Sequence, residues 1–257
     1  MLSLLSPAKK LNFDKLNRNC EASQPKFHQQ ASELAVVAAK LSSSELSDLM
    51  KISSKLAELN RARFNQFSET PLPAVSKQAV FAFAGDTYTC LNAQQIKQEN
   101  DTFFQNNIRI LSGLYGVLRP FDLIQPYRLE MSSKLKTTKG SNLYEFWGNK
   151  IAKTLQNDID HHENRTVINL ASEEYFKVVN IEAMALEVIT PKFLEIRDGA
   201  YKLISFYAKK ARGSMARFIV NNKITIPTDI KEFNLDGYMF DNGKSDKETY
   251  IFSRKSK

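Results

Sequence analysis

Short apolar runs of strand length alternate along this chain with longer segments of helical periodicity, and this alternation limits the fold more than any other feature. Residues 2–5 and 166–170 are predicted to be buried strands. Apolar residues recur at helical spacing between 25 and 67, in two or three pieces, and again from 208 to 221. Strands interleaved with helices predict the α/β class: a single domain over residues 1–257, with a mixed β-sheet surrounded by helices.

Further strands are predicted where short apolar runs meet turn signals. Residues 80–83 form one such run. The runs 192–196 and 201–206 flank Asp198-Gly199, a dipeptide typical of a hairpin. The remaining predicted strands are 108–111, a run that also fits the end of a helix, and two edge strands at 234–240 and 249–252.

Composition excludes several classes of protein. With 42% hydrophobic and 25% charged residues, the chain can bury a full core, so wholesale disorder is excluded. No apolar run approaches the ~18 residues needed to cross a bilayer. The first ten residues lack the pattern of a signal peptide. Cys20 and Cys90 provide neither a disulfide framework nor a tetrahedral metal set. We therefore expect a soluble cytoplasmic protein that needs no cofactor and does not bind a membrane.

The histidines give no metal site either. They are His28, His161 and His162, and the adjacent pair would point to different sides of a helix or strand. Both lie in a polar segment that is predicted to be exposed. We expect no metal ion to be bound there.

Positive charge is the compositional feature that points to a partner. Lysine and arginine number 36 against 28 aspartate and glutamate, a formal net charge of +8. This surplus fits solubility alone, or an anionic partner such as nucleic acid, a phosphorylated metabolite or a membrane. Six cations fall in one window without Asp or Glu: Lys202, Lys209, Lys210, Arg212, Arg217 and Lys223. Such clustering favours a binding face.

The predicted helix over 208–221 concentrates these cations. At 100° per residue, Lys209, Lys210 and Arg217 fall on one face, on either side of Gly213. The opposite face is apolar, as in any amphipathic surface helix. A glycine costs about 1 kcal/mol in a helix interior, so Gly213 indicates that something approaches the backbone closely. We expect an anion site on this face.

Ser6 and Lys9 have the spacing of the serine–lysine nucleophile pair of penicillin-recognising enzymes. The partner motifs of those enzymes are absent from the chain, and a turn after the first strand explains Ser6-Pro7 better. Lys9, at the end of that strand, is nevertheless a candidate for an anion pocket.

Five stretches together resemble the YaaA family of peroxide-stress-response proteins. They are Ser6–Lys9, Phe83–Tyr88, Leu111–Pro120 continuing to Pro126–Met131, Asn169–Lys177, and Ser205–Gly213. The resemblance implies one α/β domain of an unusual, family-specific fold that encloses a basic cleft. It also implies a cytoplasmic role in limiting hydrogen peroxide damage, through DNA binding and through lower free intracellular iron. With no metal site predicted, we expect any effect on iron to be indirect.

Gly113 and Gly116 bracket a tight turn, and relatives in that family are described as carrying a helix–hairpin–helix. The resemblance therefore implies such an element around residues 105–131, whose backbone N–H groups would contact a DNA phosphate. The spacing of the two glycines is not that of the usual hairpin. It equally fits a nucleotide-clamping loop or a plain β-turn.

Two functional hypotheses follow. The first is a nonenzymatic protein that binds double-stranded or structured DNA without sequence preference, and the second is an enzyme that acts on a nucleotide or another phosphate-bearing small molecule. Candidate DNA- or anion-binding residues are Lys9, Gly113, Gly116, Arg128, Lys177, Lys209, Lys210, Arg212 and Arg217. Candidate pocket residues are Tyr127, Glu130, Asn169, Ser172, Tyr175, Ser205 and Tyr207. A buried hydrogen-bond network that only fixes loops would explain the second set equally well.

Overall fold

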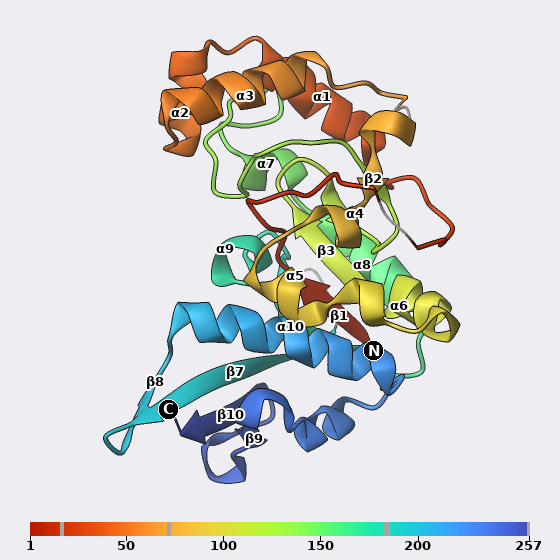
Figure 1. Ribbon diagram of the computed structural model, residues 1–257, viewed down its shortest axis with the longest axis vertical. Helices are drawn as coiled ribbons and strands as arrows, with labels where there is room; N and C mark the ends of the chain where they lie inside the picture. The colour runs from red at the N-terminus through yellow and green to blue at the C-terminus, as the bar shows by residue number, and fades with distance from the viewer. Residues whose placement is uncertain (16–17, 71–72, 182–185, 256–257) are drawn as a thin grey trace.

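Eight strands form one mixed sheet in the computed structural model, which describes residues 1–15, 18–70, 73–181 and 186–255 (Figure 1). The strand order is β4-β3-β1-β6-β7-β10-β9, and β8 pairs with β7. The strands are β1 (Leu2–Leu5), β3 (Ile108–Ser112), β4 (Gly116–Leu118), β6 (Thr166–Leu170), β7 (Glu187–Arg197), β8 (Ala200–Lys202), β9 (Met239–Phe240) and β10 (Thr249–Lys255). β3, β1, β6, β7 and β10 run parallel, whereas β4, β8 and β9 are antiparallel to their neighbours. The predicted mixed sheet is confirmed.

Helices cover this sheet and extend beyond it. They are α1 (His28–Ala39), α2 (Ser43–Met50), α3 (Ser54–Asn65), α4 (Ala79–Ala82), α5 (Asp86–Leu91), α6 (Asp101–Asn107), α7 (Leu143–Trp147), α8 (Lys150–Ile159), α9 (Glu173–Phe176) and α10 (Ser205–Asn221). α1, α2 and α3 gather at one end of the molecule, and α10 lies between α5 and β7 (Figure 1). A small second sheet pairs β2 (Lys77–Gln78) with β5 (Leu123–Ile124). Short 3₁₀ helices span Pro73–Val75, Ala93–Gln95, Gln98–Asn100, Pro227–Glu232, Leu235–Gly237 and Asn242–Lys244.

The core explains why β1 is apolar throughout. Leu2, Leu4 and Leu5 are fully buried, because β1 lies between β3 and β6 and is covered on both faces. Their side chains belong to one connected hydrophobic core. Among the helices of the described ranges, none combines the length and the apolar character that crossing a bilayer requires.

Several strand predictions are wrong in whole or in part. Residues 235–237 of the run 234–240 form a 3₁₀ helix, and Ser205 and Phe206 of the run 201–206 begin helix α10. Residues 80–83 fall largely in the short helix α4, which is buried on all sides. A short apolar run reflects burial and does not by itself distinguish a strand from a helix. The run 249–252 was expected at an edge, but β10 lies between β7 and β9. The predicted hairpin at Asp198-Gly199 is confirmed, and both residues have positive φ.

Candidate functional site

Three parallel strands end together on one edge of the sheet. Leu5 of β1 lies opposite Ile110 of β3 on one side and opposite Leu170 of β6 on the other. The chain passes from β1 to β3 on one side and later to β6 on the other, so the strand order reverses beside β1. Ligands of open α/β sheets bind outside the carboxyl ends of strands at such a point.

Hydrogen bonds of Ser6 join the segments around these strand ends. The Ser6 hydroxyl accepts a hydrogen bond from the backbone N–H of Ser172 at 2.9 Å and donates to the Ser172 hydroxyl at 3.3 Å. The Tyr88 hydroxyl of α5 donates to the Ser6 carbonyl at 2.9 Å. We call the polar groups at this edge the carboxyl-edge cluster: Ser6, Lys9, Tyr88, Ser112, Tyr127, Arg128, Glu130, Ser172, Tyr175 and Arg212.

Three buried tyrosines belong to this cluster. Tyr127 shares a hydrogen bond of 2.7 Å with the Ser112 hydroxyl at the end of β3. Burial raises the pKa of the Tyr88, Tyr127 and Tyr175 hydroxyls, and the nearby Tyr127 hydroxyl adds to the rise for Tyr88 and Tyr175. All three hydroxyls are therefore neutral at neutral pH, where they can donate and accept hydrogen bonds.

Glu130 is the buried carboxylate of the cluster, 8% exposed. One of its oxygens, Oε1, lies 2.9 Å from an Arg128 nitrogen and 3.4 Å from the Lys9 amine. The other oxygen, Oε2, is buried and has no hydrogen-bond partner among the described residues. A buried oxygen of this kind can accept a hydrogen bond or a proton from a ligand.

Gly213 lies where α10 crosses α5. A Cβ atom at this position would overlap the Thr87 carbonyl oxygen and would lie 3.0 Å from the Leu91 backbone nitrogen. The expectation that something approaches this backbone closely is confirmed, and what approaches is helix α5. Helix α5 therefore occupies the space next to the Gly213 backbone, where a ligand was expected.

Helix α5 also separates the cations of α10 into two groups. Burial raises the pKa of the Cys90 thiol of α5. The positive charges of Lys210 and Arg217 oppose this rise, so both side chains lie near Cys90. Arg212 instead lies near Glu173, at the start of α9. The Lys210 amine also lies 4.5 Å from the centre of the Phe206 ring. Lys210 and Arg217 therefore share one side of α10, and Arg212 lies on another side of the helix.

Arg212 is placed in the carboxyl-edge cluster through Glu173, the charge that acts on it, which directly follows Ser172. Burial lowers the pKa of its guanidinium, and Glu173 opposes this effect only in part. No ion pair within 4.0 Å and no hydrogen bond joins Arg212 to another residue in the parts of the chain that the structure describes. A half-buried cation without a close anion is partly desolvated, and this desolvation costs the fold stability. This arrangement suits an anionic ligand.

The glycine turn is part of the protein interior. Gly113 and Gly116 lie in a β-hairpin between β3 and β4, in which every residue from 113 to 116 is buried. A Cβ at Gly113 would overlap the Leu129 carbonyl oxygen, and one at Gly116 would lie 2.8 Å from the Trp147 ring. The helix–hairpin–helix prediction for residues 105–131 is wrong, since strands and loops follow the end of α6. The two glycines serve packing and are not placed to contact a phosphate.

Two of the other candidate residues point away from the cluster. Asn169 accepts a hydrogen bond from the Ala171 backbone at 3.0 Å and donates to the Thr190 hydroxyl at 3.4 Å, so it fixes the end of β6. The Lys177 amine lies 5.4 Å from the centre of the Tyr144 ring. Asn169 thus acts within the sheet, and Lys177 borders a separate hollow beside α7 and α8.

The remaining candidates lie near the start of α10. Ser205 and Lys209 are exposed, and the Tyr207 ring lies 5.0 Å from the guanidinium carbon of Arg254. Lys209 contributes its backbone carbonyl to the contact with α5, through a hydrogen bond of 3.1 Å from Thr87. Contacts between described residues do not link these three candidates to the cluster.

Sequence reasoning did not select Tyr88 and Ser112, and it judged Ser6 only as a nucleophile. Tyr88 and Ser112 lie within the stretches that carried the family resemblance. A predicted strand or turn accounted for each of these stretches without a functional role for either residue. One sequence feature could have pointed to these residues: side chains with hydroxyl groups follow or face the ends of three predicted strands. Only the strand order brings these ends together.

His162 lies at the opposite, amino-terminal edge of the sheet. It is half-buried, so the prediction of an exposed segment is wrong for this side chain. Its Nδ1 lies 3.2 Å from the Met1 amine and 3.3 Å from the Asn107 side-chain nitrogen. Burial lowers its pKa to about 4, helped by the charges of the Met1 amine and Arg109. Within the described ranges, no group of three or more His, Cys, Asp or Glu side chains is placed to hold a metal ion.

The lowered pKa of His162 predicts a pH-dependent stability. In the unfolded chain this histidine takes up a proton near pH 6.5, but in the folded protein only near pH 4. The unfolded state therefore binds more protons between these values, and we expect the free energy of unfolding to fall as pH decreases through this window. Urea denaturation at several pH values measures this, and His162→Gln should flatten the profile. The control is His161→Gln, which replaces an exposed side chain. An NMR midpoint near 6.5 for His162 in the folded protein would contradict the prediction.

Comparison with known protein families adds a finding that is independent of this geometry. A family model described as "Peroxide stress protein YaaA" matches residues 1–244. The match covers every segment of the carboxyl-edge cluster.

Proposed function

Because this chain belongs to the YaaA family of peroxide stress proteins, we propose that it contributes to peroxide defence by binding a phosphate-bearing small molecule, such as a nucleotide, at the carboxyl-edge cluster. The observation that carries this proposal is the half-buried guanidinium of Arg212, which forms no ion pair with a described residue. Arginine keeps its charge in proteins, and its planar fork matches phosphate oxygens. A bound phosphate would supply the missing anion.

The surroundings of Arg212 support a polar ligand. Ser172 comes directly before Glu173, the residue beside Arg212. The Ser172 hydroxyl accepts a hydrogen bond from the Ser6 hydroxyl, so the Ser172 hydroxyl proton can be donated to a ligand. The Lys9 side chain is 67% exposed and can turn toward a ligand. The free oxygen of Glu130 adds an acceptor to these donors. A site that combines hydrogen-bond donors with a buried carboxylate oxygen has the kinds of groups found in enzyme active sites.

DNA binding is the second candidate, and the exposed lysines near the cluster favour it. Lys9, Lys10 and Lys209 are exposed. They lie on adjoining segments, since Gly85 packs against Ala8 and Thr87 bonds to the backbone of Lys209. These charges and the net charge of +8 suit contacts to a phosphate backbone without sequence preference. On this view the exposed lysines, and not the buried glycine turn, would touch the DNA. A basic cleft and an effect on free iron, both implied by the family resemblance, stay predictions.

Salt dependence separates the two candidates. We expect a labelled nucleoside monophosphate to bind with an affinity that changes only a few-fold between about 50 and 200 mM salt, because one phosphate group releases few counterions. A duplex held by about four phosphate contacts would lose roughly 100-fold over the same range. Fluorescence anisotropy with both ligands measures this. Steeply salt-dependent duplex binding without nucleotide binding would reject the small-molecule proposal in favour of DNA.

A further inference from the structure

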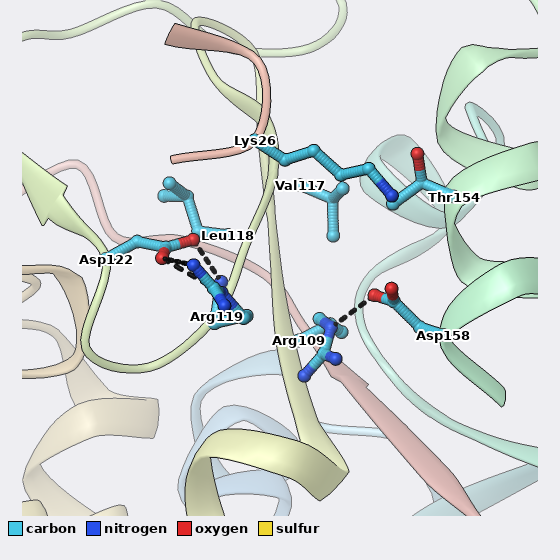
Figure 2. A pocket seen from close by; sticks show the side chains of 8 residues that line it. All are labelled: Lys26, Arg109, Val117, Leu118, Arg119, Asp122, Thr154 and Asp158. Atoms are coloured by element: carbon cyan, nitrogen blue, oxygen red, sulfur yellow. Dashed lines mark hydrogen bonds and ion pairs between the residues drawn. The ribbon is translucent and has the colours of Figure 1, made fainter. Parts of the chain in front are cut away.

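A second polar cavity lies at the other end of β3 from Ser112, between the β3–β4 hairpin and helix α8 (Figure 2). Its volume is about 260 Å³. The residues that line it are Lys26, Arg109, Val117, Leu118, Arg119, Asp122, Thr154 and Asp158. None of them belongs to the carboxyl-edge cluster.

Two ion pairs form fixed walls of this cavity. Arg109 Nε lies 2.7 Å from Asp158 Oδ2, and an Arg119 nitrogen lies 2.9 Å from Asp122 Oδ1 (Figure 2). Arg109 also donates hydrogen bonds to three backbone carbonyls, including that of Ile108 at 2.8 Å. Asp122 accepts further hydrogen bonds from the Arg119 backbone and from a serine hydroxyl. The walls are therefore formed before any ligand arrives.

Three polar groups of the lining have no partner in the portion of the chain that the structure describes. They are the Lys26 amine, the Thr154 hydroxyl and the Oδ1 oxygen of Asp158. Thr154 is only 5% exposed, and the Lys26 side chain reaches across toward it (Figure 2). Two groups that can donate thus share a small cavity with one carboxylate oxygen that can only accept.

Charge and size limit what can fill the cavity. Three cations and two carboxylates line it, so its formal charge is +1 and favours an anion. Ligand pockets for drug-sized molecules usually hold about 300–1,000 Å³, so this cavity suits a smaller group. The Asp158 oxygen would repel an anion without a proton but would accept a hydrogen bond from an anion that keeps one.

We propose that this cavity binds inorganic hydrogen phosphate. Lys26 and Thr154 would donate to its oxygens, and its remaining P–OH would donate to Asp158 Oδ1. Sulfate has the same shape but carries no proton at neutral pH, so Asp158 selects phosphate over sulfate. The phosphate of a monoester has largely lost its last proton at pH 7, since that group titrates near pH ~6.

Calorimetric titration of the full chain with inorganic phosphate and with sulfate at neutral pH tests this proposal. We expect saturable phosphate binding with a dissociation constant below about 1 mM, and sulfate binding at least about 10-fold weaker. Lys26→Met and Thr154→Val should each weaken phosphate binding by roughly 10-fold or more, since each removes a hydrogen bond to a charged group. Lys26 is exposed and valine matches threonine in shape, so both variants should fold.

Two controls separate this site from other anion sites. Lys153→Met removes an exposed charge next to Thr154 and should leave phosphate binding unchanged. Arg212→Met removes the other proposed anion site, so phosphate binding that persists in this variant but is lost with Lys26→Met belongs to the cavity beside α8. Three results would overturn the proposal: no saturable phosphate binding, sulfate bound as tightly as phosphate, or phosphate binding that is lost with Arg212→Met but kept with Lys26→Met.

Discussion

Replacing Gly213 by alanine should lower the free energy of unfolding by about 3 kcal/mol or more, although alanine is the better helix former by about 1 kcal/mol. The added Cβ would overlap the Thr87 carbonyl oxygen and would lie 2.8 Å from its carbonyl carbon. These are backbone atoms of α5 and cannot move aside by a side-chain rotation. Helices α5 and α10 would have to separate, which exposes core residues of α10 such as Met215.

Urea denaturation of Gly213→Ala and Gly243→Ala measures this effect against a matched control. At Gly243 the nearest atom to an added Cβ is the Asp241 carboxylate oxygen at 3.7 Å, an ordinary contact. That variant should stay within about 0.5 kcal/mol of the parent protein. If Gly213→Ala were as stable as the parent, α10 could not pack on α5 in the way described here.

Gly213 also shows which part of the helix packing could be predicted from the local sequence. Its place in a predicted helix indicated a close approach, and the structure contains one. The sequence could not identify the approaching element, because Thr87 lies more than a hundred residues away. The same holds for Gly113 and Gly116, whose turn was predictable, whereas their burial depends on Leu129 and Trp147. From the sequence alone, a glycine that helix packing requires cannot be distinguished from a glycine that a ligand requires.

More of the fold than of the candidate site could be predicted from the sequence. Strands 2–5 and 166–170 were predicted with their observed bounds, since each is an apolar run of strand length that stands apart from the segments of helical periodicity. The strand order was not predictable, yet this order brings Ser6 and Ser172 together. Among the candidate pocket residues, Tyr127, Glu130, Ser172 and Tyr175 do lie at this edge. Ser205 and Tyr207, two further pocket candidates, lie instead near the start of α10.

The second large effect concerns ligand binding by Arg212. Arg212→Met should weaken binding of a nucleoside monophosphate by roughly 10- to 100-fold, the usual range for losing hydrogen bonds to a charged group. The same variant should be about as stable as the parent, because methionine fills similar space and removes a half-buried charge that has no close anion. A loss of binding without a loss of stability is typical of a residue kept for function.

Arg217→Met is the matched control, since Arg217 lies on the same helix but acts on Cys90 of α5. It should change nucleotide affinity by less than about 3-fold, a difference below 1 kcal/mol. A control on this helix also excludes a general effect of its positive charge.

Nucleotide affinity of these two variants, measured side by side by fluorescence anisotropy, is the most direct test of the carboxyl-edge site. The account predicts that Arg212→Met loses binding whereas Arg217→Met keeps it. Equal binding by Arg212→Met and the parent protein, or equal losses in both variants, would contradict an anion site at Arg212.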